Sequence, residues 1–367
     1  MVNSQEHILN TPFTLEFVLG QVKSSGENGE TLADQLLSYE VHEISGGSAF
    51  FSRILKIDFN WRNSKFEPKS VVLKVPGVQN LNGLMSAALS GEELEKMVDG
   101  SNEYLEYCHS QEIIFYKQFY QIDPTLKLPK VYYGHEYRRN HNKGLIIMED
   151  LTKRATTLKM LPALSNVPPG EDEFLAQMKG ASNKLREIQP EVFNSLLDRA
   201  EKFFTKEAGE QIGYKEPKFG FPPAIVHGDL WSPNILFTKD ENENASNELA
   251  AIIDWQSAHP GNPCEDIARL LSANTPADYR RSNTQRLLKL YKEKVDFYLG
   301  YELFTLDQLN DAYRHCLAHA CAYFAFGAPM YHDMPSIIHG NDPEAQQREL
   351  LNRVQSFFED ALEQYPL

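Results

Sequence analysis

The stretch from His227 to Asn234, which reads His-Gly-Asp-Leu-Trp-Ser-Pro-Asn, constrains this chain more than any other. Apolar residues precede it at 224–226 and follow it at 235–237, and both runs are typical of short strands. The glycine and the proline inside the stretch fit a tight loop and exclude a regular element. The sequence therefore predicts a loop between two strands that carries Asp229 and, five residues later, an asparagine.

A second carboxylate follows at the end of another predicted strand. Residues 249–253 are apolar, and Asp254 comes directly after them. The intervening residues 239–248 are polar and acidic, as expected for a solvated hairpin connection. If the two strands pair, Asp229, Asn234 and Asp254 meet at one end of the hairpin. The alternative is a polar turn followed by an unrelated aspartate.

Three oxygen-bearing side chains in this arrangement suit phosphoryl transfer. The reaction uses a carboxylate that orients the attacking hydroxyl and accepts its proton, together with oxygen ligands that hold Mg²⁺ against phosphates. The spacing H-x-D-x-x-x-x-N, followed by an aspartate at a strand end, is the arrangement of a kinase catalytic loop and its metal-binding aspartate. The Phe-Gly that follows this aspartate in protein kinases is replaced here by Trp255-Gln256.

Three segments together resemble a known family: His-Gly-Asp-Leu-Trp-x-x-Asn-Ile-Leu, then Ile-Ile-Asp-Trp-Gln, then Glu-Asp-Ile-Ala-Arg-Leu-Leu. They are similar to the choline-kinase-like (CHK) family, the ecdysteroid-kinase-like branch of the aminoglycoside phosphotransferase superfamily, particularly its invertebrate members. The resemblance runs from about Glu43 to the C-terminal helices. Choline kinases usually carry Asn where Gly228 stands here, so the resemblance does not single out choline as the substrate.

The resemblance implies an α+β, bilobal protein-kinase-like fold that phosphorylates small molecules with ATP and Mg²⁺. Residues 1–151 would form the N-lobe, a small antiparallel β-sheet with a helix, and residues 152–367 a mostly helical C-lobe. In the C-lobe, helical periodicity covers residues 171–188, 191–208, 282–299, 306–326 and 343–362, and a further helix resumes by Glu265.

The same resemblance assigns roles to the residues of the catalytic stretch. Asp229 is expected to be the catalytic aspartate, and Asn234 and Asp254 the Mg²⁺ ligands. Asp266 matches a family aspartate that braces the catalytic loop. His227 is expected to orient the loop through hydrogen bonds rather than to transfer protons.

Candidates for holding the phosphates lie near the N-terminus. Strands are predicted at 41–44 and 50–59, and the small residues Gly46, Gly47 and Ser48 lie in the turn between them. A turn of small residues can fold over phosphates and offer backbone N–H groups. An ordinary hairpin turn is an equal alternative.

A lysine in a strand and a glutamate in a helix complete the kinase pattern. Lys74 is the one charged residue of the strand predicted at 70–76, where a kinase lysine would bind the α- and β-phosphates. An edge lysine whose charged end reaches water is the alternative. Glu112, on an amphipathic helix expected at 110–120, is its candidate partner, although a solvated surface glutamate fits as well. Residues 80–100 read as a helical insertion.

The strand predicted at 144–151 ends in polar residues, at the point where a bilobal kinase would connect its lobes. Backbone groups of Glu149, Asp150 and Leu151 are expected to hydrogen-bond adenine, with Met148 near the ring. This interpretation depends on the resemblance. The alternative is a plain strand end with Asp150 as a cap.

Composition limits the partners and the compartment. A formal net charge of -15 and a pI of about 5.2 argue against nucleic acid or an anionic membrane as the main partner. The charge promotes solubility, and an acidic cleft would suit a cationic substrate. The four cysteines form no C-x-x-C pair, the N-terminus lacks an apolar signal core, and no apolar run is long enough to span a membrane. We therefore expect a cytoplasmic protein.

One apolar helix offers an alternative acceptor site. Residues 316–326 are apolar nearly all round, which is typical of a buried central helix, and His319 within them is expected to be a core histidine rather than a ligand. Tyr313, Tyr323 and Phe324 could instead line an acceptor pocket, and their ring faces would favour a cation.

The predicted function is transfer of the γ-phosphoryl group of ATP to the hydroxyl of a small molecule. The acceptor could be an alcohol like choline or ethanolamine, a steroid alcohol or a xenobiotic alcohol. The alternative is a catalytically weak or inactive kinase-fold protein that binds nucleotide or acts as a scaffold. A protein kinase is disfavoured, because the irregular segment 257–263 is too short to form a platform for a peptide.

Overall fold

The computed structural model describes residues 4–22, 32–44, 51–78, 92–122, 125–139, 143–157, 178–334, 338 and 342–365. Contacts divide the chain into two compact units. Unit 1 contains residues 1–156 and 237–256, and unit 2 contains residues 157–236 and 257–367. The boundary expected from the sequence, after residue 151, differs from this division chiefly because residues 237–256 belong with unit 1.

Unit 1 is built on a five-stranded antiparallel sheet in the order β1-β2-β3-β5-β4. The strands are β1 Leu36–Glu43, β2 Ser52–Trp61, β3 Ser70–Pro76, β4 Val131–His135 and β5 Leu145–Glu149. The central strand β3 is buried along almost its whole length, which explains its continuous apolar sequence. The small antiparallel sheet expected for the N-lobe, and with it the α+β class, is confirmed.

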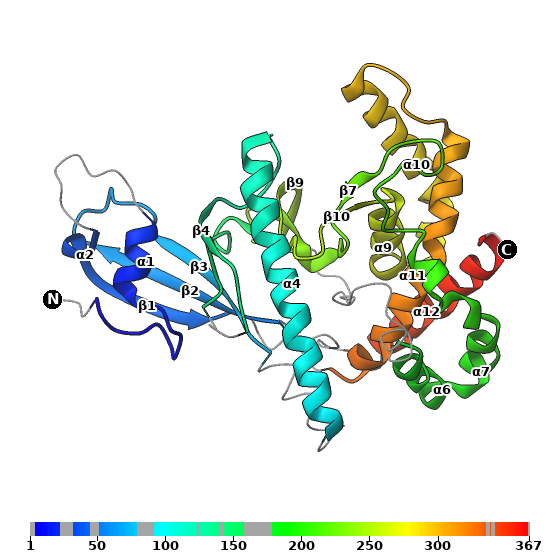
Figure 1. Cartoon of the computed structure of the whole chain (residues 1–367), viewed down its shortest axis with the longest axis horizontal. Coiled ribbons are helices and arrows are strands. Elements are labelled where there is room, and N and C mark those ends of the chain that lie inside the picture. The colour runs from blue at the N-terminus through cyan, green and yellow to red at the C-terminus, as the bar shows by residue number, and fades with distance from the viewer. Residues whose placement is uncertain are drawn as a thin grey trace. The chain divides into compact units, whose positions relative to one another are not determined.

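Helix α1, Leu15–Gln21, covers one face of this sheet (Figure 1). Its apolar residues Leu15, Val18 and Leu19 belong to the same buried cluster as strand residues of the sheet. Thr14 caps the helix by accepting a hydrogen bond from the backbone of Phe17. A second short helix, α2, spans Leu32–Gln35.

Helix α4, Glu92–Ile122, is a single helix of 31 residues (Figure 1). It is much longer than the helix expected at 110–120, and it takes up the last part of the insertion expected at 80–100. The remainder of that insertion, residues 80–91, lies outside the described residues. The buried face of α4 includes Leu105, Cys108, Ile113 and, at 1% exposure, Glu112.

A second sheet contains the predicted hairpin. Its strands are β6 Ala155–Thr157, β8 Ile235–Lys239 and β9 Ala245–Ile252, in the order β6-β8-β9. The pairing of β8 with β9 is confirmed, but their connection is shorter than expected because both strands extend into it. Backbone hydrogen bonds from Lys239 to Arg154 and from Ile252 to Lys127, 3.0 and 2.8 Å long, tie these strands to the rest of unit 1.

Unit 2 is mostly helical, as expected. Its elements are α6 Lys184–Ile188, α7 Pro190–Arg199, η1 Glu201–Phe203, α8 Lys206–Gly209, β7 Ala224–Val226, η2 Ser232–Asn234, β10 His259–Gly261, α9 Cys264–Asn274, α10 Ala277–Leu299, α11 Leu306–His332 and α12 Pro343–Gln364. The buried central helix expected from the sequence is α11, most of whose residues from Tyr313 to Tyr331 are buried.

Two expectations for unit 2 were wrong. The helix expected at 191–208 is broken into α7, η1 and α8, because Thr205 is extended and caps α8 by accepting from the backbone of Ala208. The segment at 257–263, expected to be irregular, contains strand β10, which pairs with β7 in antiparallel register. The short strand β10 holds the segment after Asp254 beside the strand that enters the catalytic stretch.

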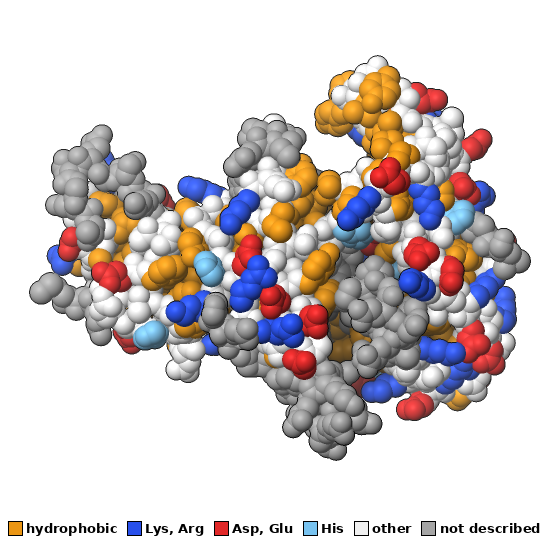
Figure 2. All heavy atoms as spheres, in the orientation of Figure 1, with side chains coloured by type: hydrophobic (Ala, Val, Ile, Leu, Met, Phe, Trp, Pro, Cys, Tyr) orange, Lys and Arg blue, Asp and Glu red, His pale blue; other side chains and the backbone are white. Residues whose placement is uncertain are grey.

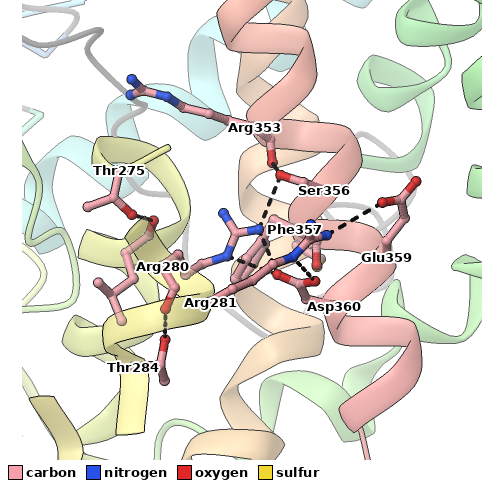
Figure 3. Close-up of polar contacts among 11 residues, drawn as sticks. Thr275, Arg280, Arg281, Thr284, Arg353, Ser356, Phe357, Glu359 and Asp360 are labelled. Carbon is pink, nitrogen blue, oxygen red and sulfur yellow. Dashed lines mark hydrogen bonds and ion pairs between the residues drawn. The ribbon is translucent and has the colours of Figure 1, made fainter. Parts of the chain in front are cut away.

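An ion-pair network joins α10 to α12 (Figure 3). Arg280 is 2% exposed and donates to Asp360 and Ser356, with the Arg280 Nη2 to Asp360 Oδ2 distance at 2.7 Å. Its guanidinium lies 5.2 Å from the ring centroid of Phe357. Arg281 donates to the other oxygen of Asp360. Because both carboxylate oxygens are used, the network fixes the two helices against each other.

The surface of unit 2 carries one prominent apolar group. Phe297, Tyr298, Leu299 and Tyr301 are exposed where α10 ends, and Figure 2 shows hydrophobic side chains gathered there. The four cysteines are free and buried. In the part of the chain that the structure describes, every helix is too short or too polar to cross a bilayer.

Candidate active site

Lys74 is the centre of the charged cluster in unit 1. Its Nζ lies 2.7 Å from Oε2 of Glu112 and 2.5 Å from Oδ1 of Asp254. Strand β3 directs the lysine out of the sheet, α4 supplies the glutamate, and the segment after β9 supplies the aspartate. The predicted pairing of Lys74 with Glu112 is confirmed, and the snorkelling alternative is wrong because the lysine is 8% exposed.

The electrostatics of this cluster follow from its burial. Burial opposes the charge on Lys74, but Asp254 and Glu112 outweigh it and raise the pKa of the lysine. The pKa of Glu112 is raised, chiefly by burial and against the pull of Lys74. Two carboxylates around one buried cation hold more negative charge than the lysine neutralises. The cluster is therefore suited to a further positive charge, such as a metal ion on Asp254.

Asp254 has a backbone φ of 64°, in the left-handed region. Aspartate tolerates this region better than most residues, but the conformation still costs about 1 kcal/mol or more. Its side chain remains 29% exposed, whereas that of Glu112 is 1% exposed. The turn at Asp254 thus presents a partly open carboxylate beside a buried lysine.

The predicted adenine segment ends strand β5. Met148 pairs with Val72 and Val131 in the sheet. The N–H of Glu149 donates to Lys130, and the carbonyl of Leu151 accepts from Ala155. The carboxylate of Asp150 accepts hydrogen bonds from Ser70 and Thr152 and forms an ion pair with Lys56. Adenine contact at this segment stays a prediction. It would use backbone groups other than the N–H of Glu149 and the carbonyl of Leu151, which are already hydrogen-bonded.

The predicted catalytic loop, His227 to Asn234, lies in unit 2 between β7 and β8 and contains η2. The carboxylate of Asp266, in the first turn of α9, accepts hydrogen bonds from the backbone N–H groups of His227 and Gly228 at 2.8 and 3.0 Å. The N–H of Ser232 donates to the side chain of Asn274 at 2.9 Å, at the other end of α9. Helix α9 therefore holds the loop at two points, and the first of them has the geometry expected for a bracing aspartate.

Gly228 is required by its backbone and by its surroundings. Its φ is +78°, and a Cβ built on it would lie 2.6 Å from the carbonyl oxygen of Ser257. A side chain would have to displace backbone, because the obstructing atom is not a flexible side-chain end. The loop therefore depends on glycine at this position.

Hydrogen bonds inside the loop orient its functional side chains. The N–H of Asp229 donates to Nδ1 of His227 at 3.2 Å, so the imidazole acts within the loop as an acceptor. Nδ2 of Asn234 donates to the carbonyl of Asp229 at 3.0 Å, so the amide oxygen is the atom of this side chain that could bind a metal ion, as predicted. The oxygens of an amide and a carboxylate are suitable ligands for Mg²⁺.

Arg269 is a functional candidate that the sequence reasoning missed. Its Nη2 donates to Oδ1 of Asp229 at 2.9 Å, and the side chains of the two residues are 5% and 1% exposed. Arg269 lies one helical turn after Asp266 on α9, so both reach the same loop. An arginine three residues after the bracing aspartate was the available signal.

A second ion pair lies beside the loop. Nε2 of His259 is 3.1 Å from Oε2 of Glu265. Burial opposes protonation of His259, but the charge of Glu265 outweighs it and raises the pKa of the histidine to about 9. Burial, with the charge of Glu265, also raises the pKa of Asp266 to about 7. Burial lowers the pKa of His319 to about 4, so its ring is neutral.

The predicted site residues fall into two groups. Lys74, Glu112 and Asp254 meet in unit 1, and the loop residues His227 to Asn234 meet Asp266 in unit 2. The meeting of both groups around one nucleotide stays a prediction. Gly46, Gly47 and Ser48 lie outside the described residues. Within the described ranges, no three His, Cys, Asp or Glu side chains gather as a metal site.

Comparison with known proteins places the chain in a family. The profile of the DUF1679 family, described as "Uncharacterized oxidoreductase dhs-27", matches residues 1–167 and 170–366. The chain belongs to this family. The match covers both units, so the whole of the described fold is that of the family.

Two curated relatives come from Caenorhabditis elegans. The "Uncharacterized oxidoreductase dhs-27" is 25% identical over 345 residues, which are 79% of this chain and 40% of that protein. The chain thus spans less than half of that relative, whose name describes the whole protein. The "Uncharacterized kinase-like protein D1044.1" is 25% identical over 300 residues, covering 72% of this chain and 75% of that protein. The resemblance to kinase-like proteins is confirmed.

Two solved structures align with most of this chain at low identity. Choline kinase from Cryptosporidium parvum aligns with a TM-score of 0.49 at 11% identity, over 95% of this chain and 96% of that one. Plasmodium vivax ethanolamine kinase aligns with a TM-score of 0.37 at 12% identity, over 88% and 81%. At these scores the likeness carries no argument about activity.

Proposed function

We propose that this chain is an ATP- and Mg²⁺-dependent kinase that phosphorylates a hydroxyl group of a small molecule. The observation that carries the proposal is Lys74, held between Glu112 and Asp254 at 2.7 and 2.5 Å. A lysine from a central strand, paired with a helix glutamate and beside a metal-binding aspartate, is the phosphate-binding arrangement of kinases. The family match alone would not supply this function.

The chemistry divides between the two groups of residues. Asp229 would orient the acceptor hydroxyl and take its proton, while the hydroxyl oxygen forms a bond to the γ-phosphorus. The bond from that phosphorus to the bridging oxygen breaks, and ADP leaves with the electron pair. Lys74 would hold the phosphates, which requires it to exchange its contact with Asp254 for one with phosphate oxygen. Asn234 and Asp254 would hold Mg²⁺, which supplies charge neutralisation at the phosphates.

The hairpin supports the meeting of these groups. Asn234 directly precedes β8, and β9 ends two residues before Asp254. Adjacent strands joined by a connection of a few residues are antiparallel, so the start of β8 and the end of β9 lie at the same edge of their sheet. We therefore expect the residues next to these two strand ends, Asn234 and Asp254, at the same edge of the hairpin. The cytoplasm, with its free nucleotide and Mg²⁺, is the compartment we propose.

The test is phosphoryl transfer itself. The protein is incubated with ATP, Mg²⁺ and a small-molecule extract, and mass spectrometry is used to find a compound that gains a phosphoryl group. Asp229→Asn should lower kcat by about 10²- to 10⁴-fold, the usual contribution of a positioned base. Asp240→Asn, in the exposed connection between β8 and β9, is the matched control and should leave kcat unchanged. Equal turnover of wild type and Asp229→Asn would contradict the role of Asp229.

One observation favours the second candidate, a kinase-fold protein that binds nucleotide without efficient transfer. Asp229 is 1% exposed and is engaged by Arg269, so the base is not freely presented. Binding of Mg·ATP by calorimetry, with no phosphorylated compound in the extract, would favour this candidate.

A further inference from the structure

We propose that the acceptor is an uncharged alcohol with a second oxygen close to its reacting hydroxyl, and that Arg269 recognises that second oxygen. This inference rests on the proposed kinase function, because it assumes that the acceptor hydroxyl binds at Asp229. It concerns unit 2 only. Three observations carry it: the pairing of the acidic groups, the use of the aromatic faces, and the spare donors of Arg269.

The acidic side chains that the structure describes around the catalytic loop, Asp229, Glu265 and Asp266, each have a partner in this chain. Asp229 pairs with Arg269 at 2.9 Å, and Glu265 pairs with His259 at 3.1 Å. The carboxylate of Asp266 accepts two backbone hydrogen bonds from the loop. An ammonium group brought into this region would meet a guanidinium before any uncompensated carboxylate. A buried cation without a partner is strongly unfavourable, so the surroundings of Asp229 disfavour a cationic acceptor.

The aromatic faces that could replace a carboxylate are not open either. The guanidinium of Arg269 lies 5.6 Å from the ring centroid of Tyr323. The rings of Tyr313 and Phe324 are buried in the core, at 4% and 1% exposure. The cation–π site that the sequence allowed for an ammonium substrate is therefore used by a cation of the protein itself.

Arg269 has donors to spare. Nε and Nη1 of this buried side chain have no hydrogen-bond partner among the residues that the structure describes. Buried donors of a charged group are normally satisfied, so these two point to a ligand that completes them. A guanidinium donates through a fixed fork and cannot accept, which requires an oxygen on the ligand.

The space beside Arg269 limits what that ligand group can be. Arg269, Gly228, His319 and Ala320 line a cavity of about 10 Å³, which also touches Glu265. A cavity of about this volume holds one water-sized group. His319 is neutral because burial lowers its pKa to about 4, so it adds no charge. One oxygen fits the space and the donors, whereas a carboxylate is too large and would lie beside Asp229 and Glu265.

The experiment compares acceptors that differ in one group. On the cyclohexane frame they are trans-cyclohexane-1,2-diol, cyclohexanol, 2-aminocyclohexanol and 2-hydroxycyclohexanecarboxylate. On the ethane frame they are ethylene glycol, ethanol, ethanolamine and glycolate. Formation of ADP and of the phosphorylated product is measured with wild-type protein. We expect the diol to exceed the mono-alcohol, the amine and the carboxylate in kcat/KM by about tenfold or more, because a site built to bond an oxygen rejects analogues without it.

Variants of Arg269 test the role of its donors. Arg269→Gln should reduce the ratio of kcat/KM for diol over mono-alcohol by about tenfold, and Arg269→Lys should keep part of it. Arg280→Gln is the matched control, since Arg280 is equally buried, paired with an aspartate and placed over an aromatic ring. That control should leave the ratio unchanged. If Arg269→Gln does not fold, Arg269→Lys still gives the comparison.

The outcomes separate this inference from the proposed function. An amine or a carboxylate with kcat/KM equal to or above that of the diol overturns the inference while supporting a kinase. Binding of Mg·ATP with no member of either series phosphorylated also overturns it and leaves nucleotide binding in place. Failure to bind Mg·ATP at all rejects the proposed function. An unchanged diol ratio in Arg269→Gln removes Arg269 from acceptor recognition.

Discussion

Trp255 stacks face to face on Phe115, with ring centroids 3.9 Å apart and ring planes 7° apart. Trp255 directly follows Asp254, and Phe115 lies three residues after Glu112 on α4. Residues at this spacing lie on neighbouring positions of a helix face. The stack therefore links the residue beside the predicted metal ligand to the helix that supplies the partner of Lys74. Trp255 stands at the position of the phenylalanine that follows the metal-binding aspartate in protein kinases.

Removing the stack should weaken nucleotide binding. Trp255→Ala leaves Asp254 without its anchor on α4, so we expect the Kd for Mg·ATP to rise about tenfold, since positioning is worth that much or more. The free energy of unfolding should fall by about 2 kcal/mol, below the range for a fully buried tryptophan. Trp255→Phe should keep the Kd for Mg·ATP and the free energy of unfolding close to those of the wild type. Calorimetry with Mg·ATP and denaturant unfolding measure the two quantities.

A tryptophan elsewhere in unit 1 provides the control for that prediction. Trp61 is 6% exposed, belongs to the core cluster of the sheet and bonds to the backbone of Pro68. Trp61→Ala should lower stability at least as much while leaving the Kd of the folded protein unchanged. If Trp255→Ala binds Mg·ATP as well as wild type, the stack does not position Asp254.

The ion pairs of Lys74 should be strongly coupled. Lys74→Met leaves Glu112 and Asp254 as like charges without their cation, which lowers stability and abolishes Mg·ATP binding. Adding Glu112→Gln should recover part of the stability, so the double-mutant cycle should give a coupling energy of about 1 kcal/mol or more. Denaturant unfolding of the four proteins measures it. A coupling within error of zero would show that the buried pair is not formed.

An exposed lysine–glutamate pair gives the comparison. Lys289 and Glu293 lie one turn apart on α10, 3.9 Å from each other and largely exposed. Because solvent screens such a pair, Lys289→Met should change stability by no more than about 0.5 kcal/mol. The cycle for this pair, measured in the same way, should show no significant coupling.

The parts of the fold that local pattern determines were predictable. Strand β3 was expected at the residues where it is found, because an unbroken apolar run with one lysine fits a central strand. The catalytic stretch was recognised by its glycine, proline and polar spacing. The break between α7 and α8 was missed because Thr205 competes for the backbone as a cap, and helical periodicity alone does not register that competition.

Contacts between distant residues were predictable only where a chemical pattern supplied them. The pair of Lys74 and Glu112, 38 residues apart, was expected from kinase chemistry. The pair of Asp229 and Arg269, 40 residues apart, was missed, because the position of the arginine three residues after Asp266 does not identify its partner. The contact of Lys74 with Asp254 spans 180 residues and depends on the tertiary fold of unit 1.

The ion pair of His259 and Glu265 should make stability depend on pH. The pKa of His259 is raised from 6.5 to about 9 in the folded protein, so protonation stabilises the folded state. This contribution is fully present below about pH 6.5 and is lost as the pH rises through about 9. A rise of this size corresponds to at most about 3 kcal/mol. Denaturant unfolding between pH 6 and about 9.5 measures the loss.

Variants separate His259 from its neighbours. The pKa of the Asp266 carboxyl is also raised, from 3.8 to about 7. Its contribution to stability is present below pH 3.8 and is lost as the pH rises to about 7. His259→Gln and Glu265→Gln should each flatten the dependence above pH 7. Glu265→Gln should also move the part below pH 7 to lower pH, because the charge of Glu265 contributes to the raised pKa of Asp266. His42→Gln, on an exposed strand of unit 1, should leave the whole curve as in wild type. A wild-type slope in His259→Gln would assign the dependence to other groups.

Gly228 should tolerate no side chain, since its φ is +78° and an added Cβ would lie 2.6 Å from the backbone oxygen of Ser257. We expect Gly228→Ala to lower the free energy of unfolding by about 2 kcal/mol, from left-handed strain of about 1 kcal/mol and the displacement of backbone. Because the loop would have to move, kcat should fall about 10²-fold, as expected when a catalytic group is misplaced by about 1 Å. Gly213→Ala is the control in the same unit, where the nearest atom, on His259, is 3.8 Å from the added Cβ. Thermal unfolding and turnover of both variants measure the difference, and equal behaviour would show that the loop at Gly228 adapts.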